Sequence, residues 1–343
     1  MSTRNDPLAT RADGPDRVVY ATGVLLDAQD FQAEQNYHRG RLARALSYAS
    51  GAGTVAGLGV VWEKTDAEDR FVDRVRVEPG MAIDRLGRIV ELTAPVCIRL
   101  QPWYDAQKPS ALALSYRHLV RITPDVSTRT GDQWAIEAGT TEMEMDGVVV
   151  DVFIRFAVRE RGKTPSFAAG PFDATDAVQP SRLRDGCEVT LHARVASDPD
   201  LPLPVPDWPA LEGVSEPSQR QRRLQDAILA RWRERSPYWT KDGLIGGPEH
   251  LPGQDPTALF LARMVLPATT SHADTARPVR NDPHLASEPV RVDNHGRAFV
   301  YTASALARVF SWHAPEAADQ PVNENVVIPV EPEPAPSPQP PGT

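Results

Sequence analysis

The sequence predicts a β-rich α+β protein, in which an N-terminal helix packs on a mainly antiparallel sheet and a second helix precedes the closing strands. Apolar and polar residues alternate over long runs, most clearly from 143 to 158. The 33 prolines, roughly twice the usual share, shorten helices and favour loops and short strands. Only two stretches, 27–49 and 216–235, repeat apolar residues at helical spacing.

Composition and charge narrow the classes of function. The formal net charge of −9 disfavours nucleic acid as the main partner. No apolar run approaches the roughly 20 residues of a membrane-spanning helix, and residues 1–6 lack the apolar core of a signal peptide. We therefore expect a protein made in the cytoplasm, without a membrane span. For Cys97 and Cys187 a disulfide is one alternative, but two reduced, buried thiols are favoured.

Changes in composition divide the chain into five segments. Residues 1–19 form a polar, flexible arm, and 20–160 form a helix and a β domain. Residues 161–254 are a loop-rich insertion that contains the second helix. Residues 255–312 return as closing strands of the same β domain. The proline-rich, acidic tail, 313–343, is expected to be disordered.

The first helix begins at Asp27, a good N-cap, and Asp30 places a second carboxylate near the positive end of the helix dipole. The residues of its thin apolar stripe are Phe31, Gln35, His38, Leu42, Ala45 and Ala49. So narrow a stripe buries little area. We expect the helix to pack on the sheet along this stripe and to contact a neighbouring subunit through another face.

Strands follow from alternation and from turn residues. We expect them over 72–77, 81–83, 88–90, 112–116, 119–122, 143–158, 187–195, 258–266, 290–292 and 297–301. Asp84 to Gly87 forms a hairpin loop, in which the glycine can adopt a positive φ. The glycines from 51 to 59 follow a helix and not a strand, so they predict a bend with close backbone packing and not a dinucleotide-binding loop.

The second helix is expected from Glu216 to Arg235, with Pro217 in its first turn and Pro237 after its end. The residues expected on its buried stripe are Leu224, Ile228, Leu229 and Trp232. Its arginines are interpreted as a solvated face in preference to a binding site for an anionic partner.

An Asp-x-x-Gly-Arg pattern occurs twice, at 84–88 and at 293–297. Each copy lies between two predicted β segments. Convergent turn chemistry explains the pair better than an internal duplication does.

No catalytic or metal-binding signature is present. The chain lacks a Gly-x-Ser-x-Gly elbow, a phosphate-binding loop and a His-Glu-x-x-His zinc motif. His38 is interpreted as a structural hydrogen-bonding residue. The histidines in predicted loops, including His250 and His295, lie near aspartates but without ligand spacing. We therefore predict no enzyme activity, no metal and no cofactor.

Three short motifs follow one another between 23 and 90. The residues of the first are Gly23, Leu25, Leu26, Asp30, Phe31, Glu34, Gln35, Tyr37 and Arg41. The residues of the second are Gly53, Val55, Gly57, Leu58 and Val60. The residues of the third are Val77, Pro79, Gly80, Ala82, Ile83, Asp84, Gly87, Arg88 and Ile89. Together they resemble a family found in phage tails and in phage-tail-like contractile injection systems. The chain departs from the family pattern at 43–48.

The resemblance implies a structural or adaptor component at the baseplate or fibre attachment, which assembles with other particle subunits as an oligomer. It also implies a route out of the cell as part of the particle. The residues expected to make the interface are Asp30, Phe31, Glu34, Gln35, Tyr37, His38 and Arg41. Two alternatives remain: a glycan- or cell-surface-binding module of a tail fibre, favoured by seven Trp and seven Tyr, and a hydrolase carried by the particle.

Overall fold

A computed structural model describes residues 17–67, 70–131, 133–165, 178–195, 201–205, 208–233, 235–270, 277–283 and 288–309. The chain forms two compact units, 1–300 and 301–343, and α6 (Ala303–Val309) is the described helix of the second. The predictions about residues 1–16 and about the tail, 313–343, lie outside the described residues. Among the described helices, none has the length and apolar character needed to cross a membrane.

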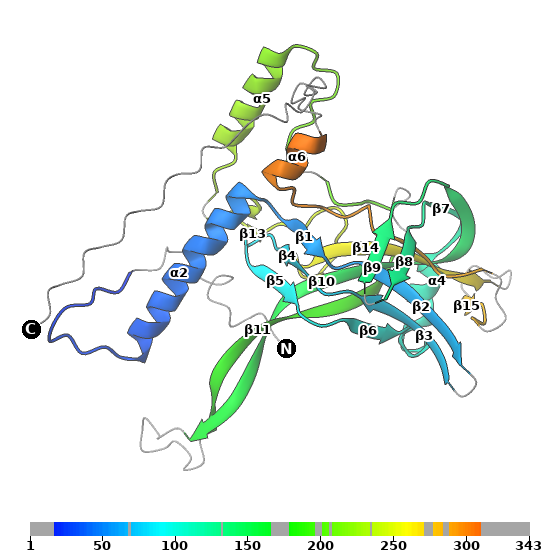
Figure 1. Cartoon of the computed structure of the whole chain (residues 1–343), viewed down its shortest axis with the longest axis horizontal. Coiled ribbons are helices and arrows are strands. Elements are labelled where there is room, and N and C mark those ends of the chain that lie inside the picture. The colour runs from blue at the N-terminus through cyan, green and yellow to red at the C-terminus, as the bar shows by residue number, and fades with distance from the viewer. Residues whose placement is uncertain are drawn as a thin grey trace, which may run out of the picture. The chain divides into compact units, whose positions relative to one another are not determined.

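The first unit is β-rich with a helix at its start, which confirms the predicted fold class (Figure 1). Its helices are α2 (Ala28–Ala49), α3 (Leu100–Asp105), α4 (Pro109–Ser115) and α5 (Pro217–Ala230). Its first strands are β1 (Gly53–Gly57), β2 (Val60–Ala67), β3 (Arg70–Val77), β4 (Gly80–Ile83), β5 (Ile89–Leu92), β6 (Val96–Arg99), β7 (Tyr116–Ile122), β8 (Val126–Thr130) and β9 (Gln133–Glu137). Its later strands are β10 (Met143–Pro165), β11 (Val178–Ala193), β12 (Trp239–Thr240), β13 (Gly243–Leu244), β14 (Leu259–Thr269), β15 (Val279–Arg280) and β16 (Arg291–Asp293).

The largest sheet has six strands, and β10 and β14 form its centre. The strand order is β11-β10-β14-β15, with β7 paired to β10 and β16 paired to β14. All these pairs are antiparallel, and Val150 of β10 lies opposite both Ala193 of β11 and Met264 of β14. The predicted return of the late strands to the β domain is therefore confirmed.

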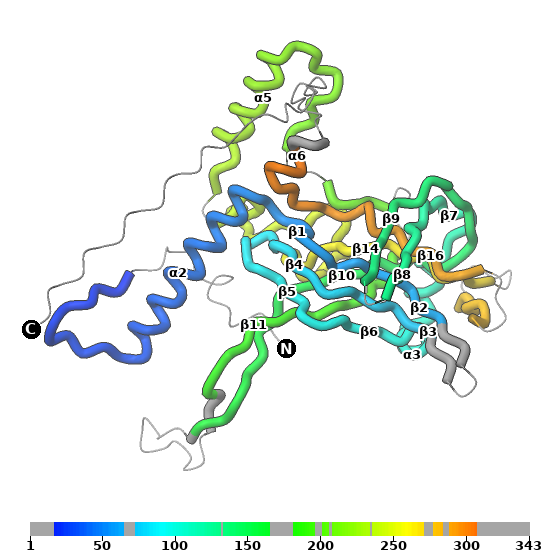
Figure 2. The backbone as a smooth tube through the Cα atoms, viewed as in Figure 1, coloured from blue at the N-terminus to red at the C-terminus, as the bar shows by residue number. Residues whose placement is uncertain are grey.

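Two three-stranded sheets, β1-β4-β5 and β2-β3-β6, complete the core. The trace in Figure 2 lets the reader follow β5 beside the large sheet, where it contacts both β10 and β11. Their inward side chains, such as Val75 and Val90, join one apolar cluster with Val150 and Leu261 of the large sheet. A layered β core results, and α2 and the hairpin predicted around residue 85 lie at one end of it.

Two predicted strands are wrong. Residues 112–115 lie in α4, because Pro109 fits a first helical turn and the Ala-Leu-Ala-Leu run favours helix over the apparent alternation, and Tyr116 begins β7. Residues 297–301 form no strand, and Phe299 makes an isolated bridge to Thr54. Here the guanidinium of Arg297 is buried and donates to the Leu58 carbonyl, which fixes a compact loop.

The two cysteines are separate free thiols, so the predicted reduced state agrees with the structure. The expectation that both are buried is wrong for Cys97, which is exposed on β6. Alternate residues of this short strand point outward, and Cys97 is one of them. Cys187 is half-buried in β11, and its burial raises the pKa of its thiol.

Candidate assembly surface

The start of α2 is fixed by a capping box. The Asp27 carboxylate accepts hydrogen bonds from the backbone N–H groups of Gln29 and Asp30, and the Asp30 carboxylate accepts one from the Asp27 N–H at 2.9 Å. Three backbone N–H groups that would otherwise lack intrahelical partners are satisfied in this way. The predicted N-cap is confirmed, and Asp30 has a local role in the helix whether or not it also contacts a partner.

The apolar stripe of α2 points away from the protein, contrary to our expectation. The buried residues of the helix are Ala43 and Ser47. At 3.6 residues per turn, the six stripe residues lie on the opposite side, and the structure shows all six as exposed. Phe31 is 53% exposed and Leu42 is 55% exposed. The small side chains of Ala43 and Ser47 permit a close backbone approach, and this decides which side of the helix packs inward.

The close approach is made to the hairpin turn between β4 and β5. Gly87 has φ 82°, and a Cβ atom there would lie 1.8 Å from the carbonyl oxygen of Ala43 in α2. The buried Asp84 carboxylate accepts hydrogen bonds from the Leu86 and Arg88 N–H groups and from Arg88 Nε at 2.7 Å. The turn is therefore a rigid support for the C-terminal half of α2.

The other predicted turn residues also mark close backbone packing. A Cβ atom on Gly53 would lie 2.7 Å from the Ala298 carbonyl oxygen, and one on Gly57 would lie 2.2 Å from that of Pro79. A Cβ atom on Gly80 would lie 2.3 Å from the Ala56 carbonyl oxygen. The interpretation of this glycine run as a bend with close backbone packing is confirmed, and the run ties β1 to β4.

The seven residues predicted to make the interface lie along one stretch of α2. Those whose side chains are exposed are Phe31, Gln35, His38 and Arg41. Those that are half-buried are Asp30, Glu34 and Tyr37. His38 Nε2 lies 3.7 Å from Glu34 Oε1, and its ring meets that of Tyr37 edge-on with 5.4 Å between ring centroids. These residues thus form a continuous, accessible surface of aromatic and polar groups.

The second helix, α5, has no buried residue, so its predicted buried stripe is wrong. Leu229 is 80% exposed, Ile228 and Trp232 are also exposed, and Leu224 is half-buried. The helix is anchored at its end, where Trp232 stacks on Tyr48 and the Tyr48 hydroxyl donates to the Arg233 carbonyl at 2.7 Å. The stripe has the predicted spacing, but it faces outward because the helix does not pack on the sheet.

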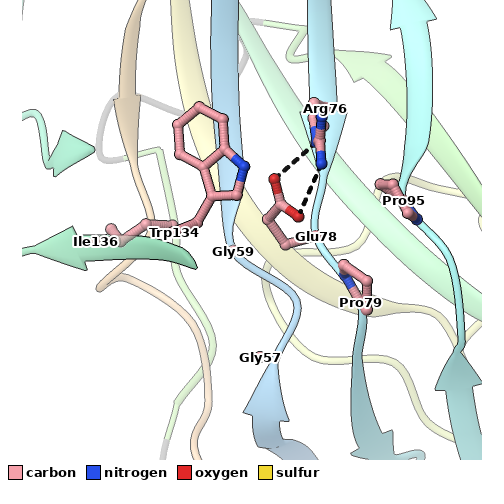
Figure 3. A pocket seen from close by; sticks show the side chains of 8 residues that line it. All are labelled: Gly57, Gly59, Arg76, Glu78, Pro79, Pro95, Trp134 and Ile136. Carbon is pink, nitrogen blue, oxygen red and sulfur yellow. Dashed lines mark hydrogen bonds and ion pairs between the residues drawn. The ribbon is translucent and has the colours of Figure 1, made fainter. Parts of the chain in front are cut away.

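An open groove of about 490 Å³ lies beside β9 (Figure 3). The predicted turn residues Gly57 and Pro79 line it, but its charged and aromatic side chains, Arg76, Glu78 and Trp134, were not predicted. Arg76 projects into it, with Nε 2.7 Å from a Glu78 carboxylate oxygen. The guanidinium carbon of Arg76 is 5.6 Å from the ring centroid of Trp134, and that of Arg129 is 5.5 Å from the same ring. The alternation of residues 133–137 signals a strand, but only the folded sheet brings Trp134 to Arg76.

Asp125, Asp293 and His295 come together from distant parts of the chain, with candidate ligand atoms within 4.8 Å of one another. Hydrogen bonds account for this arrangement. Asp125 receives one from the Asn294 N–H, its other oxygen lies 2.5 Å from His295 Nδ1, and Asp293 receives one from the His295 N–H. The cluster fixes a loop and gives no independent indication of a cation.

The repeated Asp-x-x-Gly-Arg pattern produces two different turns. Arg88 pairs with Asp84 inside its own turn. Arg297 donates to the carbonyl oxygens of Asn294 and Leu58, and its burial lowers the pKa of its guanidinium to about 10. The shared pattern reflects turn formation and not a shared site.

Comparison with protein-family models and with curated proteins finds no match to this chain. The resemblance to components of contractile injection systems thus depends on the three motifs alone. The structure places the first motif, from Asp30 onward, on the accessible part of α2, and the third motif in the hairpin that supports this helix.

Proposed function

We propose that this chain is a structural adaptor of a phage-tail-like contractile injection particle, at the baseplate or fibre attachment, and that it acts by binding other subunits. One observation carries the proposal: the apolar side of α2 faces away from the protein's own core. In a helix that serves only its own fold, this side would face inward.

The energetics of α2 support a partner. A helix in water gains most of its stability from tertiary packing, and the two fully buried residues of α2 both lie in its C-terminal half. Phe31 and Leu42 are already about half covered, so burying the remainder would contribute roughly 0.8–1.5 kcal/mol for each side chain, about half of the value for full burial. Aromatic side chains such as those of Phe31 and Tyr37 are enriched in the cores of protein interfaces.

The test replaces Phe31 and Tyr37 together by alanine in the full chain and measures incorporation into particles. We expect a folded monomer, because neither side chain is buried, and loss of incorporation. Leu183→Ala is a matched control, because Leu183 is 67% exposed on β11, away from α2. If the double variant entered particles as the wild type does, α2 would have no assembly role.

A second candidate function is binding of a glycan or another cell-surface ligand in the groove beside Trp134. An aromatic side chain next to paired Arg76 and Glu78 offers both an apolar surface and hydrogen-bonding groups. A glycan array probed with the full chain tests this candidate. Binding that Trp134→Ala abolishes would support it, and an array without specific binding would remove it.

A further inference from the structure

The two helices that face outward carry opposite charges. Residues 20–38, which include the first half of α2, contain three acids and no lysine or arginine. These acids are Asp27, Asp30 and Glu34. Residues 217–233, which include α5, contain five arginines and a single acid, Asp226. An acidic surface and a basic surface are therefore present on the same chain, each beside exposed apolar residues.

Each charged surface has an apolar centre. On α2, Glu34 lies one turn after the exposed Phe31. On α5, Arg222 lies two turns before Leu229 on the same side of the helix. Leu229 lies beside two further exposed apolar residues, Ile228 and Trp232. The two surfaces are therefore complementary: the apolar centres can pack on each other, and the acidic border of one can face the basic border of the other.

The chain cannot join these two surfaces within itself. Within one chain, α2 meets the end of α5 where Tyr48 stacks on Trp232. Phe31 lies 17 residues before Tyr48, and this corresponds to about 25 Å along the helix axis. In addition, Arg222 and Arg223 are exposed and form no hydrogen bond or ion pair within the part of the chain that the structure describes.

We infer that α5 of one copy binds the first half of α2 of a second copy, so that the chain associates with itself head to tail. This inference rests on the proposed function, since it uses the same α2 surface and names a second copy as its partner. The two contacting surfaces differ, so each copy keeps one free surface after the first contact. Such an arrangement continues into a closed ring or an open filament.

The test uses two full-length variants, each with one surface disabled. Phe31→Glu disables α2 and leaves α5 intact, whereas Leu229→Glu disables α5 and leaves α2 intact. We expect sedimentation velocity to show that wild-type chains associate as their concentration rises. Each variant alone is expected to associate with an affinity lower by about tenfold or more. An equimolar mixture of the two variants is expected to form a one-to-one dimer and to stop there, because only one competent pair of surfaces remains.

Leu183→Glu is the control, because it places the same charge at an exposed leucine outside both helices. It is expected to associate as the wild type does, and circular dichroism checks that every variant is folded. The inference is overturned if the wild type stays monomeric, if either variant associates like the wild type, or if the mixture yields no dimer. Failed particle incorporation of the Phe31/Tyr37 variant would then still support the proposed function, with a different protein on α2.

Discussion

At the scale of single residues, this protein buries several arginines and gives each of them acceptors. Arg280 pairs with Asp73 at 2.6 Å, and Arg263 pairs with Asp151 at 2.8 Å. Both pairs join residues that are more than 100 positions apart in sequence. A buried charge without a partner is strongly destabilising, so these pairs select the arrangement in which each arginine meets its acceptor.

Glu249 is a buried carboxylate whose pKa lies well below its ordinary value. Its oxygen lies 2.9 Å from Arg85 Nη2 and 3.3 Å from His250 Nδ1. Burial alone would raise the pKa of this carboxyl, but the hydrogen bond to His250 and the charge of Arg85 outweigh it and lower the pKa from 4.5 to about 2. The folded state therefore favours the ionised form of Glu249.

Glu249→Gln should lower the free energy of unfolding at neutral pH by roughly 3 kcal/mol, the value that corresponds to this pKa difference. The folded-state pKa is below the unfolded-state pKa, so the stabilisation is present above pH 4.5 and is lost as the pH falls toward 2. Urea unfolding at several pH values measures the difference between wild type and variant. Glu91→Gln, at an exposed position, is the control. A difference that stays constant down to pH 2 would contradict this account.

At the scale of elements, the contact between α2 and the β4–β5 turn connects the helix to the sheet. Two requirements coincide at Gly87, a positive φ and the absence of a Cβ atom next to the Ala43 carbonyl. Either one alone favours glycine. Because Gly87 meets both requirements, the sequence motif of the hairpin and that of the helix depend on each other structurally.

Gly87→Ala should destabilise the protein by more than the roughly 1 kcal/mol that an alanine at positive φ costs, because the new methyl group also overlaps α2. Gly131→Ala separates the two effects. Gly131 has φ 60°, and a Cβ atom there would meet nothing within 4 Å. Thermal unfolding of both variants measures the difference. Equal losses of stability would show that α2 is not held by this close approach.

Sequence patterns identified the two longest helices and the central strands β10 and β14, but not always the side that each presents. The capping residues of α2 and the hairpin at Asp84 are local features, so they were predictable. The outward direction of the α2 stripe was not, because it depends on Ala43 approaching Gly87 across 44 residues of sequence. The same holds for α5: its apolar residues recur at helical spacing, as predicted, but they do not pack on the sheet.

At the scale of the whole molecule, the candidate site was predictable only in part. The α2 residues follow from one helix, whereas the groove joins Arg76 of β3 to Trp134 of β9 and requires the folded sheets. The closing strand β14 was expected to return to the early β domain. The structure shows that ten of its eleven residues are buried and that it pairs with β10, β15 and β16.

Ending the chain after residue 255 should abolish cooperative unfolding, since it removes β14 from the centre of the sheet. Ending it after residue 300 should preserve the transition, because residues 1–300 form a compact unit. Calorimetry of the two shortened chains and of the full chain measures this difference. A cooperative transition in the shorter chain would show that β14 is dispensable.

The position of β14 also has a consequence during synthesis. Val150 of β10 pairs with Met264 of β14, so this edge of β10 stays unpaired until a partner strand 114 residues further along the chain has been synthesised. At about 5–20 residues per second, the wait lasts about 6–23 s. Throughout that interval a nascent chain presents an apolar, unpaired strand edge to its surroundings. Rapid overproduction should therefore drive the chain into inclusion bodies, and slower translation in the presence of a holding chaperone should recover native protein.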